Sequence, residues 1–269
     1  MVAVLAGGPL LVACSLVTDL DLAGDPLPPA DEGGTLEAGD GPAGDGAPRV
    51  TSDGGSDSKA PCIVDDDSFC DDFETAPLQE RWDERRETNG GTVSVESGAL
   101  VTEIPALAGS TAALVHALRG PRTKLSCSLS LTPEIMPEAR STVFALRSQL
   151  TDAEIVEHVI QLRMRTSRTE LVASWELVDG GAGSAAKDLD AFAHFAAGAT
   201  RTLRIDVAYS ATEPTSYKLY IDGIERYASS SPAVPPTRIT ATKLFVGISS
   251  TLNTTAAKLR YDDVRCVEE

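Results

Sequence analysis

The chain has 269 residues, of which 42% are hydrophobic, and a formal net charge of -17 at pH 7. This length allows one or two domains, with enough apolar residues for a substantial core. Residues 78–269 contain 24 acidic and 21 basic side chains, a net charge of -3, whereas residues 15–77 contain 16 and 2, a net charge of -14. The excess of acidic residues therefore lies in residues 15–77. Residues 78–269 are nearly neutral and show no stripe of basic residues, which argues against nucleic-acid binding.

An apolar run, VAVLAGGPLLV, opens the chain and is followed by Ala13 and Cys14. At about 11 residues it is too short to span a bilayer and suits the core of a signal peptide. Leu11-Val12-Ala13-Cys14 resembles the lipobox of bacterial lipoproteins, which implies cleavage after residue 13 and lipidation of Cys14. No Lys or Arg precedes the run, so either the true start lies upstream of Met1 or the signal is weak. An ordinary secretory signal or an apolar tail is the alternative.

Residues 14–61 form a leader rich in Gly, Pro, Ala, Ser and Asp, with segments such as EAGDGPAGDGAP and almost no large apolar side chains. Such a composition buries too little surface to offset the entropy lost when a chain is ordered. We predict a disordered acidic tether with a root-mean-square reach of roughly 35–40 Å. The expected location is the cell envelope, with the membrane as partner through the lipid. Ser15 after the cysteine favours the outer membrane by the sorting pattern of lipoproteins.

The body of the chain, residues 62–269, consists of short alternating runs separated by turn residues. In Thr123–Leu131, TKLSCSLSL, every second side chain is apolar, which predicts a half-buried strand. Asp222-Gly223 between two apolar runs predicts a tight hairpin, and Asp188–Ala197 has a partly helical pattern. Ten or more short strands without long crossover helices predict an all-β antiparallel sandwich of two sheets. The other expected strands are a first strand beginning at FCDDFE, then Thr92–Glu96, Ala99–Ile104, Ala112–Leu118, Thr142–Gln149, Val156–Met164, Glu170–Leu177, Arg201–Tyr209, Tyr217–Ile221, Ile224–Tyr227, Lys243–Ser249 and Lys258–Cys266.

Several segments carry a resemblance to a known fold. FCDDFE with a nearby tryptophan, RTLRIDVAYS followed by YKLYIDGIE, and KLFVGISS followed by KLRYDDVRC resemble strands of concanavalin A-like and laminin G-like jelly rolls. The resemblance spans about Asp65–Glu269, and it is greatest to exported bacterial lipoproteins that carry such a domain behind a low-complexity leader. In this superfamily the first and last strands lie near each other in one sheet, which implies that FCDDFE and YDDVRC are close together.

The five cysteines suit an exported protein. If Cys14 bears lipid, then Cys62, Cys70, Cys127 and Cys266 remain, and four cysteines allow three pairings that the sequence does not distinguish. We prefer Cys62 with Cys70 and Cys127 with Cys266, the second joining a middle strand to the last one. Free or zinc-binding thiols are the alternative, but no paired CxxC is present, and disulfides suit an oxidising compartment.

A structural calcium ion is the one metal that the resemblance implies. Several jelly-roll relatives hold calcium where the first and last strands meet, and by that analogy the candidate ligands are Asp72, Glu74, Asp262 and Asp263. Alternation would place Asp72 and Glu74 on one face of the first strand and Phe69 and Phe73 on the other. The alternative is that these acids are solvated at a sheet edge, where charge discourages aggregation. No other cofactor is expected.

The clearest enzymatic pattern is Asp152-Ala153-Glu154-Ile155-Val156-Glu157. It resembles the Glu-x-Asp-x-x-Glu of laminarinase-type glycoside hydrolases, in which a bulged strand aims nucleophile and acid into one cleft about 5 Å apart. The first two acids are exchanged relative to that pattern. Thr151–Glu154 also fits a simple hairpin turn, after which His158 would face the core and Glu157 the solvent. We therefore predict no catalytic residue in this segment.

Few aromatic side chains are available as platforms for sugars, since only 5% of the residues are aromatic. Trp175 lies on the apolar face of its strand and is predicted to be core, whereas Trp82 is either a platform or a staple over the sandwich edge. We predict a lipid-anchored envelope protein presenting a non-catalytic binding or adhesion domain, with carbohydrate as the favoured ligand. The alternatives are a glycan-active hydrolase of the laminarinase type and a purely structural envelope protein.

Overall fold

The computed structural model describes residues 68–74, 77–151, 153–189, 195–252 and 254–268, which belong to a unit spanning Ser58–Glu269. The predicted signal peptide, the tether, Cys14 and Cys62 lie outside the described residues. None of the helices in the described ranges has the length and apolar character that a membrane crossing requires.

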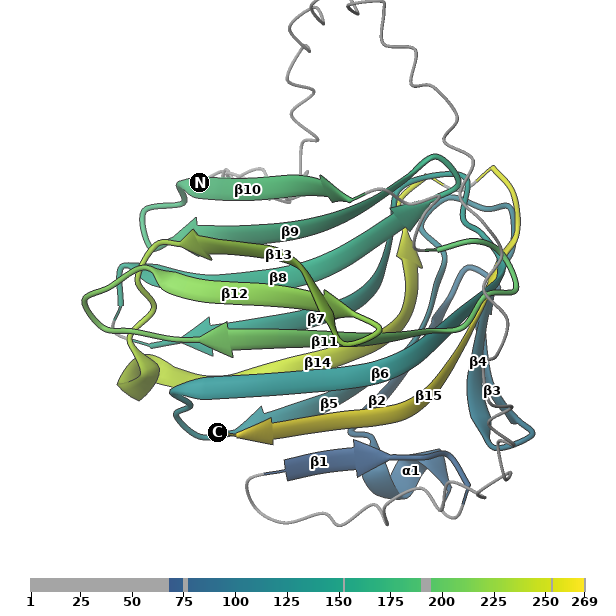
Figure 1. Ribbon diagram of the computed structural model, residues 1–269, viewed down its shortest axis with the longest axis horizontal. Coiled ribbons are helices and arrows are strands. Elements are labelled where there is room, and N and C mark those ends of the chain that lie inside the picture. The colour runs from purple at the N-terminus through teal and green to yellow at the C-terminus, as the bar shows by residue number, and fades with distance from the viewer. Residues whose placement is uncertain (1–67, 75–76, 152, 190–194, 253, 269) are drawn as a thin grey trace, which may run out of the picture. The chain divides into compact units, whose positions relative to one another are not determined.

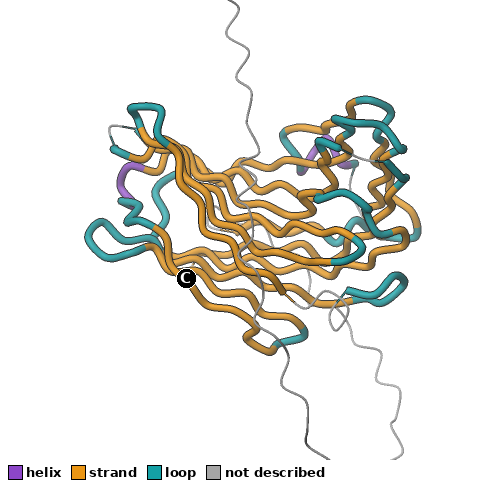
Figure 2. The backbone as a smooth tube through the Cα atoms, turned by 90° about the horizontal axis from the view of Figure 1, so that it is seen from above, coloured by secondary structure: helices purple, strands orange, loops and turns teal. Residues whose placement is uncertain are grey.

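Two antiparallel sheets form a sandwich, which confirms the predicted fold (Figures 1 and 2). Sheet A runs in the order β13 (Ile224–Ser231), β12 (Thr215–Ile221), β11 (Arg201–Ala208), β6 (Lys124–Ile135), β15 (Ala257–Glu268), β4 (Ala99–Ile104) and β3 (Thr92–Glu96), with β1 (Ser68–Asp71) also paired to β15. Sheet B runs in the order β10 (Ala182–Leu189), β9 (Arg168–Leu177), β8 (Ile155–Arg165), β7 (Ser141–Leu150), β14 (Ile239–Ser250), β5 (Thr111–Arg119) and β2 (Glu84–Thr88). The described helices are the single turns α1 (Leu78–Arg81) and η1 (Pro236–Arg238).

The core lies between the sheets and is built by the period-two alternation of the strands. On β6, Leu125, Cys127, Leu129 and Leu131 are all at most 2% exposed, as the sequence predicts. Tyr261 of β15 crosses the core, and its hydroxyl lies 3.0 Å from the backbone carbonyl oxygens of both Val143 and Gly247 in sheet B. Because this buried hydroxyl is satisfied by the opposite sheet, it fixes the relative position of the two layers.

A disulfide joins Cys127 to Cys266, which confirms the preferred pairing. The two residues are direct register partners on the neighbouring strands β6 and β15. Cys70 is also disulfide-bonded, to a partner outside the described residues, so its pairing with Cys62 stays a prediction.

Two edge strands and one expected helix differ from the sequence analysis. β2 and β10, at opposite edges of sheet B, have sequences ERRET and AGSAAKDL. Both lack the regular alternation that identifies a strand. The segment Asp188–Ala197, expected to be partly helical, begins instead inside β10, and its residues 190–194 lie outside the described ranges. The β10 segment forms a strand by pairing with β9, although its own sequence pattern does not predict one.

The opening FCDDFE forms a short strand, not an alternating one. β1 ends at Asp71, and Phe73 has a positive φ of 57°, so the chain turns instead of extending to Glu74. Asp71 is 3% exposed and accepts hydrogen bonds from Trp82 Nε1 at 2.7 Å, from the Phe73 amide at 2.8 Å and from Arg81 at 2.9 Å. The predicted separation of acids and phenylalanines holds, since Phe69 and Phe73 are buried and Asp72 and Glu74 are not. The extended strand expected beyond Asp71 is wrong, because this buried carboxylate organises a turn.

Asp71→Ala is expected to lower the free energy of unfolding by about 3 kcal/mol, because it leaves the buried Trp82 indole N–H without its acceptor and removes the nearer of the two carboxylates beside Arg81. Urea unfolding followed by tryptophan fluorescence measures the loss. The adjacent Asp72 provides the matched control, since its side chain is 25% exposed and lies 3.6 Å from Arg81. Asp72→Ala should cost below about 1 kcal/mol, and equal losses in the two variants would contradict the role of Asp71.

Candidate functional site

A groove lies on the outer face of sheet B, across the middle strands β8, β7, β14 and β5 and the edge strand β2. We call it the basic groove. Its volume is about 180 Å³. Its lining side chains are Arg86, Val115, Thr142, Ala145, Arg147, Gln149, Val159, Gln161, Lys243, Phe245 and Ser249.

Small residues keep the floor of the basic groove low. Ala145 lines it, and Gly247 of β14 pairs with Ala113 of β5 on the same outer face. Gly247 has a φ of 146°, and a Cβ there would collide with the backbone of Ala112. Position 247 therefore requires glycine, and the bulge of β14 between Val246 and Ser249 lies at this close approach.

Two cations are cross-strand neighbours in the basic groove. Arg147 of β7 and Lys243 of β14 are register partners, so two like charges lie directly opposite each other on one face. Such a pair is unfavourable in the absence of an anion. Glu157 of β8 compensates in part, with its carboxylate 3.4 Å from Arg147, and no carboxylate is among the groove-lining residues.

At the β2 edge of the groove, Glu84 and Arg86 form a two-point ion pair, with distances of 2.8 Å from Arg86 Nε and from Nη2. The hydrogen bonds from Arg86 lower the pKa of Glu84, and the charge of Lys243 lowers it further. Glu84 thus stays ionised and paired at neutral pH. Arg163 shares the outer face through its register partner Thr142, but its partner on β9 is the carboxylate Glu170, so the excess of positive charge is confined to the groove-lining Arg86, Arg147 and Lys243.

Amide side chains add directional donors to this charge. Thr142 donates its hydroxyl hydrogen to Gln161 Oε1 at 2.9 Å, which occupies the amide oxygen and leaves the Gln161 NH₂ group available to a ligand. Gln149 contributes a second amide to the lining. Cations beside amide donors on one face are suited to holding an oxyanion.

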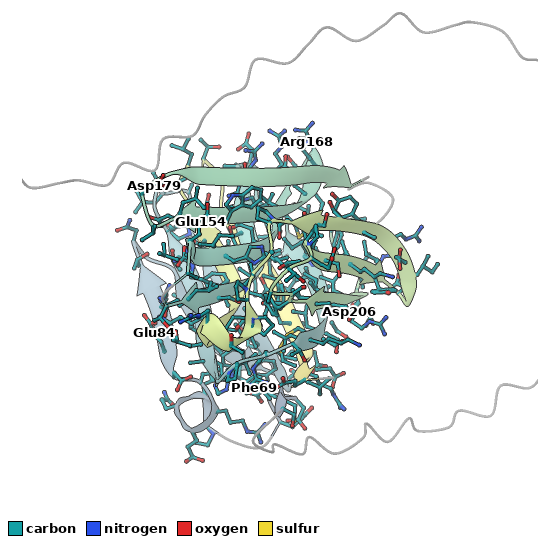
Figure 3. All side chains as sticks on the ribbon, turned by 90° about the vertical axis from the view of Figure 1, so that its left-hand side faces the viewer. Phe69, Glu84, Glu154, Arg168, Asp179 and Asp206 are labelled. Carbon is teal, nitrogen blue, oxygen red and sulfur yellow. A yellow bond between two sulfur atoms is a disulfide. The ribbon has the colours of Figure 1, made fainter. Side chains whose placement is uncertain are left out.

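Two acids of the laminarinase-like pattern, Glu154 and Glu157, lie within the described ranges. Glu154 lies in the turn between β7 and β8, as predicted, and lines a different cavity at the end of the sandwich. Glu157 lies beside the basic groove with Arg147, and Asp152 is outside the described residues. Figure 3 shows Glu154 beneath β10, on the side of the molecule that carries Asp179. Because Asp152, which stands at the nucleophile position of the pattern, is outside the described residues, the absence of a catalytic pair in this segment stays a prediction.

The strands proposed to share calcium are neighbours, since β1 pairs antiparallel with β15. The proposed ligands Asp72 and Asp262 accept hydrogen bonds locally, from the amides of Glu74 and Asp263 at 3.2 and 2.8 Å. Within the described ranges, no group of three or more His, Cys, Asp or Glu side chains is arranged to hold a metal ion. The calcium ion stays a prediction.

His116, His158, Trp82 and Trp175 are not among the residues that line the basic groove. His158 is 1% exposed, with its Nε2 2.8 Å from Ser231 Oγ, and burial lowers its pKa to about 4. It is therefore a neutral core residue at pH 7, as predicted. His116 stacks on Phe69 at 4.1 Å, and His194 is outside the described ranges. Trp82 is 4% exposed, a staple and not a platform, whereas Trp175 is only partly buried.

No family model and no curated protein sequence matches the chain. Among solved structures, the chain is similar to an endo-β-1,4-glucuronan lyase from the fungus Trichoderma reesei, with a TM-score of 0.60, 14% identity, and coverage of 76% of this chain and 96% of that one. It is also similar to the alginate lyase Aly36B, at a TM-score of 0.52, 8% identity, and 76% and 97% coverage. An endo-β-galactosidase from Clostridium perfringens matches at a TM-score of 0.53 and 9% identity, with 77% and 64% coverage.

These neighbours are glycan-cleaving enzymes, which contradicts our prediction of a non-catalytic binding or adhesion domain and favours its glycan-active alternative. The prediction weighed only one acidic motif and a low aromatic content, and it missed the cations of sheet B. At 8–14% identity, the likeness establishes a shared fold, the jelly-roll sandwich.

Proposed function

We propose that this β-sandwich is an enzyme that cleaves an acidic polysaccharide bound along the basic groove. The observation that carries the proposal is the cross-strand pair Arg147 and Lys243, in a groove lined by three cations and no carboxylate. Such a site attracts an anion in a domain whose net charge is itself slightly negative. Two structural neighbours are named for glucuronan and alginate, which are polymers of uronic acids. The predicted lipid-bearing Cys14 would hold the enzyme in the cell envelope.

The positions of the carboxylates favour elimination over hydrolysis. Hydrolysis uses two carboxyl groups roughly 5–9.5 Å apart on either side of the scissile bond. Glu84 and Glu157 lie on β2 and β8, which are separated by four strand spacings in sheet B, or about 19 Å. They are too far apart to act as such a pair, and both are paired to arginines.

Elimination from a uronate needs positive charge against the sugar carboxylate, because negative charge develops there as the C5 proton leaves. Arg147 and the Gln161 amide would supply that stabilisation, and Lys243 is the neighbouring group that could transfer the proton. In the balanced step the Lys243 amine, in its neutral form, takes the C5 proton as the C5–H bond breaks, a C4=C5 double bond forms, and the bond from C4 to the glycosidic oxygen breaks. The resulting ammonium group then gives that oxygen a proton.

The test uses the full chain with polyglucuronate, with alginate and with a neutral β-1,3-glucan as control polymer. Two signals are followed together: new reducing ends, and the ultraviolet absorbance of the double bond conjugated to the carboxylate. We expect both to rise on an acidic polymer and neither to rise on the neutral glucan. Reducing ends without absorbance would indicate hydrolysis and refute the elimination step, and cleavage of none of the polymers would refute the proposed function.

A further inference from the structure

A second cavity lies at one end of the sandwich, where the β7–β8, β9–β10 and β11–β12 turns meet the segment between β13 and β14. We call it the end pocket. Its volume is about 600 Å³, against about 180 Å³ for the basic groove, and this is within the range of roughly 300–1,000 Å³ typical of ligand sites. Its lining includes Ile155, Trp175, Leu177 and Pro232, with Glu154 and Arg238 as its two charged side chains.

Trp175 supplies an aromatic surface to the end pocket. Its register partner on β8 is the buried His158, so the indole lies on the inner side of sheet B, opposite to the basic groove. On β10 its partner is Gly183, where any Cβ would collide with the indole ring. Glycine therefore makes room for the ring at the edge of the sandwich, where β9 and β10 extend past β13 (Figure 1). The partly buried indole retains surface that lines the pocket.

Backbone hydrogen bonds hold the two charged residues of the end pocket in place. The amide of Val178 donates to the Glu154 carbonyl at 2.8 Å, and the amide of Thr151 donates to the Arg238 carbonyl at 3.0 Å. The chain at both positions is thus fixed to a neighbouring element before any ligand arrives. Preformed walls reduce the ordering cost of binding. The pair Glu154 and Arg238 carries no net charge, in contrast to the basic groove.

We propose that the end pocket binds a neutral pyranose unit of a glycan. An aromatic face among mostly apolar lining side chains suits the C–H face of a sugar ring, and the Glu154 carboxylate and Arg238 guanidinium of the same pocket can accept from and donate to its hydroxyl groups. The carboxylate of Glu154 disfavours a uronate at this position. The proposal does not depend on catalysis in the basic groove. For a polymer that contains both acidic and neutral units, such a second contact would raise the affinity without any change in the groove.

Tryptophan fluorescence of the full chain tests the proposal, because the chain has two tryptophans and the other, Trp82, is 4% exposed. We titrate with neutral cellohexaose and laminarihexaose and expect a saturable shift in emission with at least one of them. Glu154→Gln and Arg238→Gln should each raise the dissociation constant about tenfold. Both side chains are exposed, so thermal melting should be unchanged.

The matched control is Arg147→Gln in the basic groove, which should leave the dissociation constant of the neutral sugar unchanged. No saturable shift with either hexaose would overturn the proposal. So would an undiminished response in the double variant Glu154→Gln/Arg238→Gln, or a response that Arg147→Gln abolishes. Because polymer cleavage is not the readout, failure of this site is distinguishable from failure of the proposed function.

Discussion

Arg147→Gln is expected to lower kcat/KM on the cleaved polyuronate by about 100-fold, because one charged donor to a developing anion contributes roughly two to three orders of magnitude. Lys243→Gln should cause a loss of similar size, and the double variant should lose less than the product of the two, since the side chains are neighbours that act on one group. Initial rates of double-bond absorbance measure each variant. Higher ionic strength should raise the KM of the wild type, because salt screens the attraction of the groove for the polyanion.

The control for charge is Arg204→Gln on the outer face of sheet A. Arg204 is stacked on Tyr220 at 4.0 Å and lies 3.2 Å from Asp206. Arg204→Gln removes one positive charge from the domain, as Arg147→Gln does, but at a position outside the basic groove. Its kcat/KM should stay within twofold of the wild type. Equal losses for Arg204→Gln and Arg147→Gln would show that overall charge matters and that the basic groove is not the site.

Strands that alternate were predictable from the sequence, and strands that do not were missed. β3 and β4 have the predicted bounds Thr92–Glu96 and Ala99–Ile104, because each is set by a clear pattern and a turn. β2 and β10 are the two edges of sheet B. An edge strand buries less of its surface and tolerates charge or small residues, and in β2 and β10, unlike the edge strand β3 of sheet A, such residues remove the alternation. The prediction of an extended strand at FCDDFE was wrong for a different reason. The buried Asp71 directs a turn there, and the alternation of apolar and polar residues does not predict such a turn.

The basic groove was beyond the sequence analysis because its residues come from five strands. Arg147 and Lys243 each occupy an outward position of a half-buried strand, where a charged side chain is expected to be solvated. Only the register of β7 against β14 brings them side by side, and pairing between distant strands is not encoded in local periodicity. The available signal was a cation at an outward position on more than one strand. Arg147 and Lys243 form a candidate anion site because they are adjacent, although each position by itself is an ordinary one for a charged side chain.

Opening the Cys127–Cys266 disulfide is expected to lower the free energy of unfolding by about 4–5 kcal/mol. The bond links residues 139 positions apart, and without it the unfolded chain regains the freedom of that long loop. The double variant Cys127→Ala/Cys266→Ala, measured by urea unfolding against the wild type, gives the loss. The midpoint should fall with little loss of native secondary structure, because β6 and β15 remain paired through their backbones.

A second disulfide in the same chain provides a control for the first. Comparing the two losses of stability distinguishes the effect of loop length from the effect of losing any disulfide. Cys70 is disulfide-bonded, and with Cys62 as partner it would close a short loop worth roughly 2.5 kcal/mol. Cys62→Ala/Cys70→Ala should therefore cost about half as much as the Cys127 and Cys266 pair. Both pairs costing the same would contradict the loop-entropy account. A loss below about 1 kcal/mol for the long loop would mean that the unfolded state already keeps β6 and β15 together, since residual structure there removes the entropy that the bond would otherwise suppress.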